Sequence, residues 1–464
     1  MRLVKPVVKC TARVLQWGVV GVVLLMCIGL RWGLTPIPKP PPGVRLQPIR
    51  PAVKVADLRP DNAAFSYLDA VQQLHGSKGS ASLREDMDAL LAGDVPTNTN
   101  PIIQAIAATH PALDRVQQAS SVAFCQMPWT DMSTNDISYD SGTRYLTRLI
   151  CCRGKLAEQA GNASTALQDY LLVTKVGTDC SQGAPLIGSL VANSIASTGC
   201  AAIRKCVLQQ PVDAQQMTLT ISRLRQMQTD FQPFAETLRH EILSIERLLD
   251  TEVLTNAGAY ILIDKRVIRK LTEAAIGDMI AEAEKPPYLS EADKVARKWE
   301  MAGGLTWTLA FNRPFATTLV SMLIPALPPV YAKQFRRDTE FLATEVVCAL
   351  KSYQVAHGTY PERLNELVPD FLSAVPSDPF DGKPLRYRRE GKEWVLWSVG
   401  SDLKDDNAAW HEYKYRSHRA FDRAGGDIYF KSTEPQDDLA FYRSQQEAKS
   451  KWPTHSGNTP TAAL

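Results

Sequence analysis

The sequence lacks the short motifs that mark the commonest families of enzymes and nucleic-acid-binding proteins. It contains no GxSxG, GxGxxG, P-loop or HExxH pattern, and no basic run alternates with aromatic residues. The first four patterns are typical of a catalytic serine, a dinucleotide-binding site, a phosphate-binding loop and a zinc site, in that order. A basic run with aromatic residues is typical of nucleic-acid binding. The formal net charge of +3 over 464 residues adds little attraction to a polyanion. We therefore expect no nucleic-acid partner and predict no catalytic residues.

Paired cysteines are also missing. The nine cysteines are odd in number and include no CxxC. Cys151 and Cys152 are adjacent, and adjacent side chains on a helix diverge by about 100°, so they are poorly placed to bind one metal ion. We predict buried, unreactive thiols. The alternative, for a region outside the cytoplasm, is one or two disulfides among Cys125, Cys180, Cys200 and Cys206.

Charge is absent from residues 14–30, VLQWGVVGVVLLMCIGL, a length that just crosses a hydrocarbon core as a helix. Basic residues precede it, and no convincing small-x-small cleavage site follows. We predict a cytoplasmic segment at 1–13 and an uncleaved transmembrane anchor at 14–30. The protein would then be a single-pass protein of a cell inner membrane, with its bulk periplasmic or otherwise extracytoplasmic. Residues 31–60 are rich in proline and predict a stiff spacer.

Residues 61–330 have the apolar periodicity of an α-helical domain, with Asn62 near the N-cap of the first helix and Phe65, Leu68 and Val71 on its apolar side. The expected helices are 63–74, 83–91, 112–120, 145–160, 163–176, 186–208, 213–249 with a break at Gln232–Pro233, 264–283 and 291–301, and 127–142 is expected to be a loop. The apolar segment 303–330 contains Arg313 and Pro314. We predict a buried hairpin or membrane-surface segment there, with a second span as the alternative.

The helical pair 145–160 and 163–176 resembles a tetratricopeptide repeat. Gly154, Ala166 and Tyr170 fall where that repeat places two small residues and one aromatic residue. Ile150 and Ala157 replace the usual Trp and Tyr, and no further copy follows cleanly. A generic helical hairpin is the alternative.

Residues 331–431 predict an α+β domain, followed by a polar and partly disordered tail at 432–464. An apolar stripe, made by Leu342, Val346, Ala349, Leu350 and Tyr353, predicts a long helix. Gly358 would end this helix, and Tyr360–Pro361 would open a short one. Residues 384–388 and 393–398 predict a β-hairpin across Glu390–Gly391. The expected architecture is one helix on a small antiparallel sheet, so the whole chain is expected to be mainly α.

Three stretches of this domain, ALKSYQVAHGTYP, VPSDPFDGKPLRY and SVGSDLKDD, resemble in order the globular domain of the major pseudopilin of type II secretion systems. In that family the acidic loop after the last hairpin holds calcium with aspartates and backbone carbonyls. The resemblance implies calcium ligands at Asp402, Asp405, Asp406 and Asp427. A solvated turn without metal is the alternative, because Leu403 replaces the usual glycine and 407–424 is an insertion.

The placement of the domain differs from that of a pseudopilin. The predicted anchor has no glutamate, and about 300 residues separate it from this domain. The order of anchor, helical middle and pseudopilin-like end also resembles a set of uncharacterised bacterial envelope proteins. We expect a non-enzymatic, membrane-anchored envelope protein with a structural or interaction role, whose helical domain binds a protein partner. The alternative is an envelope hydrolase or other enzyme with its site among the helices, which would require converging polar groups.

Overall fold

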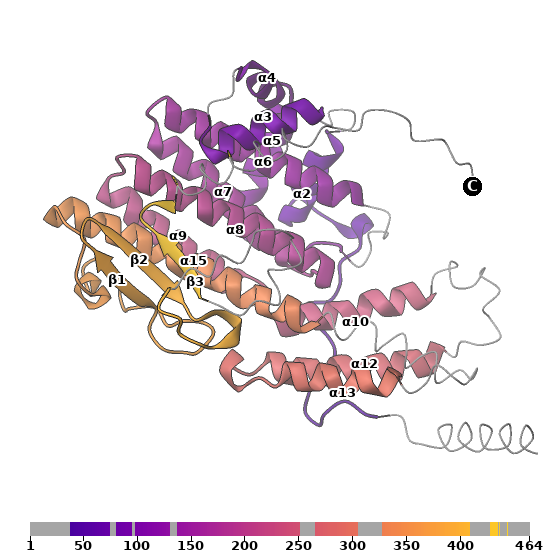
Figure 1. Ribbon diagram of the computed structural model, residues 1–464. Coiled ribbons are helices and arrows are strands. Elements are labelled where there is room, and N and C mark those ends of the chain that lie inside the picture. Colours follow the sequence, from indigo (N-terminus) through magenta and orange to yellow (C-terminus); the bar gives the residue numbers. More distant parts are fainter. Residues whose placement is uncertain are drawn as a thin grey trace, which may run out of the picture. The chain divides into compact units, whose positions relative to one another are not determined.

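The computed structural model describes residues 38–74, 80–94, 98–129, 137–250, 265–304, 327–408 and 427–434, together with 436 and 443. These residues are mainly helical and include one small antiparallel sheet (Figure 1). They form two compact units. Unit 1 contains the described residues of 38–52, 183–187, 232–250, 265–304 and 327–334, and unit 2 contains those of 53–182, 188–231 and 335 onwards. This division differs from the predicted boundaries at 61, 331 and 432.

Unit 2 holds most of the helices. They are α2 Ala63–Gln72, α3 Ala81–Ala92, α4 Asn100–Ala108, α5 His110–Ser121, α6 Ile137–Gln159, α7 Ala163–Ser181, α9 Ala214–Asp230 and most of α8 Leu186–Gln209 and α15 Leu327–His357. The N-cap prediction is confirmed, since the Asn62 side chain accepts a hydrogen bond from the Ala64 amide at 3.1 Å. The predicted face of α2 is one position off. Phe65 is 42% exposed, while Ala63, Tyr67 and Ala70 are buried.

Close backbone approach characterises α6, α7 and α8. A Cβ atom added at Gly154 would lie 2.6 Å from Cε1 of Tyr170, so the ring lies directly on the glycine. A Cβ atom at Gly177 would lie 2.5 Å from the amide nitrogen of Ala196. Gly154 and Tyr170, two of the three residues that suggested a tetratricopeptide repeat, are therefore in contact within one hairpin. The family resemblance itself stays a prediction.

Helix α15 begins at Leu327, earlier than predicted, because Pro328 and Pro329 occupy its first turn, where no backbone N–H is needed. Its central part is buried on nearly all sides rather than along one stripe. Helix α9 runs antiparallel to it, with Arg225 bonded to Glu345 and Phe231 against the Phe341 ring. The sheet residues Trp394, Leu396 and Phe430 belong to the same apolar core. A helix enclosed in this way is expected to be mainly apolar, and its buried exceptions Thr344 and Glu345 are hydrogen-bonded.

The sheet of unit 2 has the order β1-β2-β3 and is antiparallel throughout. Its strands are β1 Arg386–Glu390, β2 Glu393–Ser398 and β3 Ile428–Lys431. The predicted hairpin is confirmed, and Gly391 has a φ of +68° in its turn, a value that favours glycine. Strand β3 was not predicted. The expected helix after Tyr360 is instead a short 3-10 turn, Leu364–Leu367.

Unit 1 contains α10 Phe234–Asp250, α12 Lys265–Ala283, α13 Ala292–Gly304 and the chain segment 38–52. This segment packs on α10 and α12, since a Cβ atom at Gly277 would lie 2.7 Å from Cβ of Pro40. Residues 38–52, part of the predicted stiff spacer, therefore pack on these two helices. The predicted anchor 14–30, most of the apolar segment 303–330 and nearly all of 432–464 lie outside the described residues.

One described helix, α8, is long and apolar enough to cross a membrane. Most of its apolar window is buried inside the protein, as in the core helix of a soluble domain. It also carries the buried Arg204, so we interpret α8 as a core helix of unit 2.

Candidate functional site

The predicted calcium loop follows strand β2 and begins with a 3-10 turn, Gly400–Asp402. Leu403 has a φ of +59°, a left-handed conformation that is unfavourable for a side chain with a Cβ atom. Leu403 therefore makes a left-handed turn at the position where the resemblance implies a glycine.

The structure shows what three of the four predicted ligands bind. Asp402 accepts a hydrogen bond from the Lys404 amide at 3.2 Å. Asp405 Oδ1 accepts from Trp397 Nε1 at 3.0 Å and from the Asn407 amide at 3.0 Å. Asp427 accepts from the amides of Asp406 at 3.3 Å and Ala408 at 2.7 Å. These carboxylates fasten the loop to β2 and to the start of β3 through N–H donors.

The four carboxylates do not form one donor set. Among the residues that the structure describes, no group of three or more acidic, histidine or cysteine side chains is arranged to hold a metal ion. Calcium at Asp402, Asp405, Asp406 and Asp427 stays a prediction, and the observed contacts do not fit it.

Sequence reasoning missed the centre of this region, which is Arg386 at the start of β1. Its Nη1 lies 2.7 Å from Asp378 Oδ2 and 3.1 Å from Asp381 Oδ1, and its Nε lies 3.6 Å from Asp405 Oδ2. The Asp378 side chain is fully buried and also accepts from Ser398 Oγ at 2.8 Å and the Val399 amide at 3.0 Å. The signal was present in SDPFDGKPLR, where two turn aspartates precede an arginine.

The charges of this cluster stabilise each other. Burial alone would raise the pKa of Asp381, but hydrogen bonds from Arg386 and the Lys383 amide lower it below the usual value. The hydrogen bond from Trp397 lowers the pKa of Asp405. Both carboxylates are therefore ionised at neutral pH and attract the guanidinium.

A second buried arginine, Arg204 on α8, connects three distant segments of unit 2. Its Nη1 lies 2.8 Å from Glu340 Oε2 on α15, and its Nε and Nη2 donate to Glu434 at 3.0 and 2.9 Å. Its Cζ atom lies 4.7 Å from the centre of the Phe430 ring on β3. Burial would lower the pKa of Arg204, but Glu434 and Glu340 raise it above its usual value.

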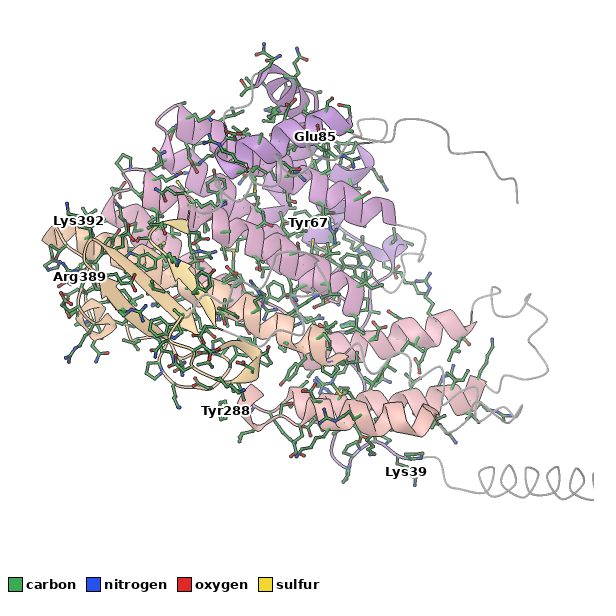
Figure 2. All side chains as sticks on the ribbon, in the orientation of Figure 1. Lys39, Tyr67, Glu85, Tyr288, Arg389 and Lys392 are labelled. Atoms are coloured by element: carbon green, nitrogen blue, oxygen red, sulfur yellow. The ribbon has the colours of Figure 1, made fainter. Side chains whose placement is uncertain are left out.

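The helices of unit 2 contain further buried polar pairs, the nearest approach to a hidden active site. Tyr67, labelled in Figure 2, donates to Asp179 at 2.7 Å, and Lys175 also binds Asp179. Burial raises the pKa of Tyr67 well above its usual value, and Asp179 adds to the effect. A similar pair joins Tyr170 and Glu158 at 2.6 Å. Each of these two carboxylates accepts hydrogen bonds from side chains of the same helix or of an adjacent one. This arrangement is typical of structural polar groups.

The prediction of buried thiols is confirmed for the seven cysteines that the structure describes. All are buried and free of disulfides, and they include Cys125, Cys180, Cys200 and Cys206. Burial raises the pKa of Cys151, Cys200 and Cys348 to about 12. These thiols are protonated at neutral pH and therefore weakly nucleophilic.

The polar centre of unit 1 is Glu236 on α10. It accepts from Arg45 Nη2 at 3.0 Å, from the Ile49 amide at 2.9 Å and from Arg239 Nη1 at 2.7 Å. On the next turn, His240 is 2% exposed, and its Nδ1 has no hydrogen-bond partner among the described residues. Burial lowers the pKa of His240 to about 4. This histidine is neutral at physiological pH.

Comparison with known proteins adds no family to these observations. A scan of family models found no match, and searches of curated proteins and of solved structures found none either.

Proposed function

We propose that the chain is a membrane-anchored envelope protein with a structural, protein-binding role rather than an enzymatic one. In this proposal residues 14–30 span the inner membrane and the folded part lies on the periplasmic side. The observation that carries it is the charge-free segment 14–30 directly before the folded chain. Residues 31–37 can extend over at most about 25 Å, so unit 1 lies next to the membrane.

The contacts of residues 38–52 support this role for unit 1. Because Pro40, Arg45 and Ile49 contact α10 and α12, the anchor joins a folded surface rather than a long free tether. In unit 2, the long helix on a three-stranded sheet supports a pseudopilin-like domain used for assembly. We assign the surface for a protein partner to its helical hairpins.

The test of the anchor compares the full chain with a variant lacking residues 2–37. The full chain should sediment with membranes and resist extraction by alkaline carbonate, while the truncated chain should remain soluble. A reporter enzyme that works only in the periplasm should be active when it is fused after Pro51. A reporter that works only in the cytoplasm should be inactive at the same position. A full chain in the soluble fraction, or activity of a cytoplasmic reporter, would contradict the proposal.

Among the residues that the structure describes, the cluster of Tyr67, Lys175 and Asp179 is the one we test for the enzymatic alternative. Tyr67→Phe separates the two functions, because it removes the hydroxyl and keeps the ring. A structural role predicts lower thermal stability and unchanged capture of partners by cross-linking in intact membranes. An enzymatic role predicts the loss of a measurable hydrolytic activity with the fold retained.

A further inference from the structure

We propose that Arg386 is a resident cation that joins the loop 400–408 to the turn 378–382, so that the loop is ordered without the calcium ion that the pseudopilin resemblance implies. The side chain of Arg386 is 14% exposed and faces the carboxylates of Asp378, Asp381 and Asp405. Three negative charges around one site require a cation. A guanidinium supplies it permanently, with donors in a planar fork that matches carboxylates.

The oxygen atoms that a calcium ion would use are already bound to N–H donors. Asp405 is held by Trp397, Asp427 by two backbone amides, and the Asn407 carbonyl oxygen accepts from Arg388 Nη1 at 3.3 Å. Calcium needs about 6–8 oxygen ligands. Arg386 and Arg388 of β1 therefore bind two oxygen atoms of the loop, one of the Asp405 carboxylate and the Asn407 carbonyl oxygen.

Pairing of β1 with β2 brings Arg386 and Trp397 next to each other. Arg386 is paired with Trp397 across β1 and β2, and both residues contact Asp405. The register of the hairpin thus places a cation and an N–H donor at one carboxylate. Folding of the hairpin is sufficient to order the loop, without a supply of metal. This inference is independent of the proposed membrane anchor.

The test uses the detergent-solubilised full chain and the variants Arg386→Gln and Arg389→Gln. Arg389, labelled in Figure 2, is a matched control on the same strand, because it binds Glu362 at 2.6 Å and not the loop. Thermal midpoints are measured in EDTA and in millimolar calcium chloride. The wild-type midpoint should be the same in both. In EDTA, Arg386→Gln should lower the midpoint by roughly 4 °C or more, and Arg389→Gln by about 1 °C or less.

Two results would overturn the proposal. One is a wild-type midpoint that rises with calcium and falls in EDTA. The other is an Arg386→Gln variant no less stable than Arg389→Gln. If Arg386→Gln does not fold, Asp405→Asn replaces it. Its loss of stability should be the same with and without calcium if Arg386 is the partner, whereas a loss seen only in calcium would establish a metal site.

Discussion

Buried charge is stabilised in different ways in the two units. In unit 2, Arg204 binds Glu340 and Glu434, which lie more than 100 residues away along the chain. In unit 1, Glu236 binds residues of one helix and of the segment 38–52, while His240 on the next turn is buried without a charge. Both units contain completed long-range pairs, because Glu236 and Arg45 are 191 residues apart, and unit 1 depends in addition on a group remaining neutral. The two units should respond differently to substitution and to pH.

The largest effect is expected for Arg204→Met. It leaves Glu340 and Glu434 buried without their cation, and breaking such a pair destabilises a protein by about 3–5 kcal/mol. Denaturant unfolding measures this loss. Arg223→Met, at an exposed position on α9, is the control and should change stability by about 0.5 kcal/mol or less. Adding Glu340→Gln and Glu434→Gln to Arg204→Met should restore part of the stability, and failure to do so would argue against charge as the cause.

Gly177→Ala should destabilise unit 2 by about 2–3 kcal/mol. Alanine normally favours a helix over glycine by about 1 kcal/mol, so the sign is opposite to that of helix propensity. The reason is the backbone of α8, since the new Cβ atom would lie 2.5 Å from the Ala196 nitrogen. Ser194→Ala on the exposed side of α8 is the control. Equal or higher stability of Gly177→Ala would show that the two helices can separate without loss.

Acidification should act on unit 1 through His240. Its folded pKa of about 4 lies below the usual value of 6.5, so the unfolded chain binds the proton more readily. The stability that the neutral histidine contributes is fully present above pH 6.5 and is lost as the pH falls toward 4. The loss between pH 7 and pH 5 is about 2 kcal/mol. His240→Phe should remove this part of the pH dependence in urea unfolding, and an unchanged pH slope would contradict the assignment.

The smallest effect is expected for Arg45→Met. Arg45 is half exposed, so its ion pair with Glu236 contributes only about 1 kcal/mol or less. The substitution should loosen the segment 38–52 and increase its cleavage by protease without unfolding α10. Lys39→Met, at an exposed position of the same segment, is the control. Equal cleavage of both variants would mean that Glu236 does not hold the segment.

Local signals predicted much of the fold. Four predicted features depend on only a few neighbouring residues each, and all four are found in the structure. They are the Asn62 cap, the helix break at Gln232–Pro233, the helix end at Gly358 and the turn at Glu390–Gly391. The near-complete burial of α15 was not predicted, because the sheet and α9 that enclose it come from elsewhere in the chain. Strand β3 was missed for the same reason, since it is stabilised by pairing with β2 and has no strong pattern of its own.

The sequence singled out the acidic loop after β2, but it did not predict the contacts of the carboxylates there. The acidic residues after β2 were recognised from the pseudopilin resemblance, and Asp405 and Asp427 do fasten the loop. The role of Arg386 could not be read from its position, because β1 carries three arginines and only the fold distinguishes them. Arg388 contacts the Asn407 carbonyl, and Arg389 binds Glu362 instead.

The composition of β1 also bears on how the sheet behaves in solution. In the three-stranded sheet that the structure describes, β1 is an edge strand, and its sequence is RYRRE. An edge strand exposes backbone groups that can pair with another chain, and charged side chains along it disfavour such pairing. Two copies paired antiparallel about Arg388 would place two arginines side by side. The half-exposed Arg388 therefore disfavours aggregation through this edge.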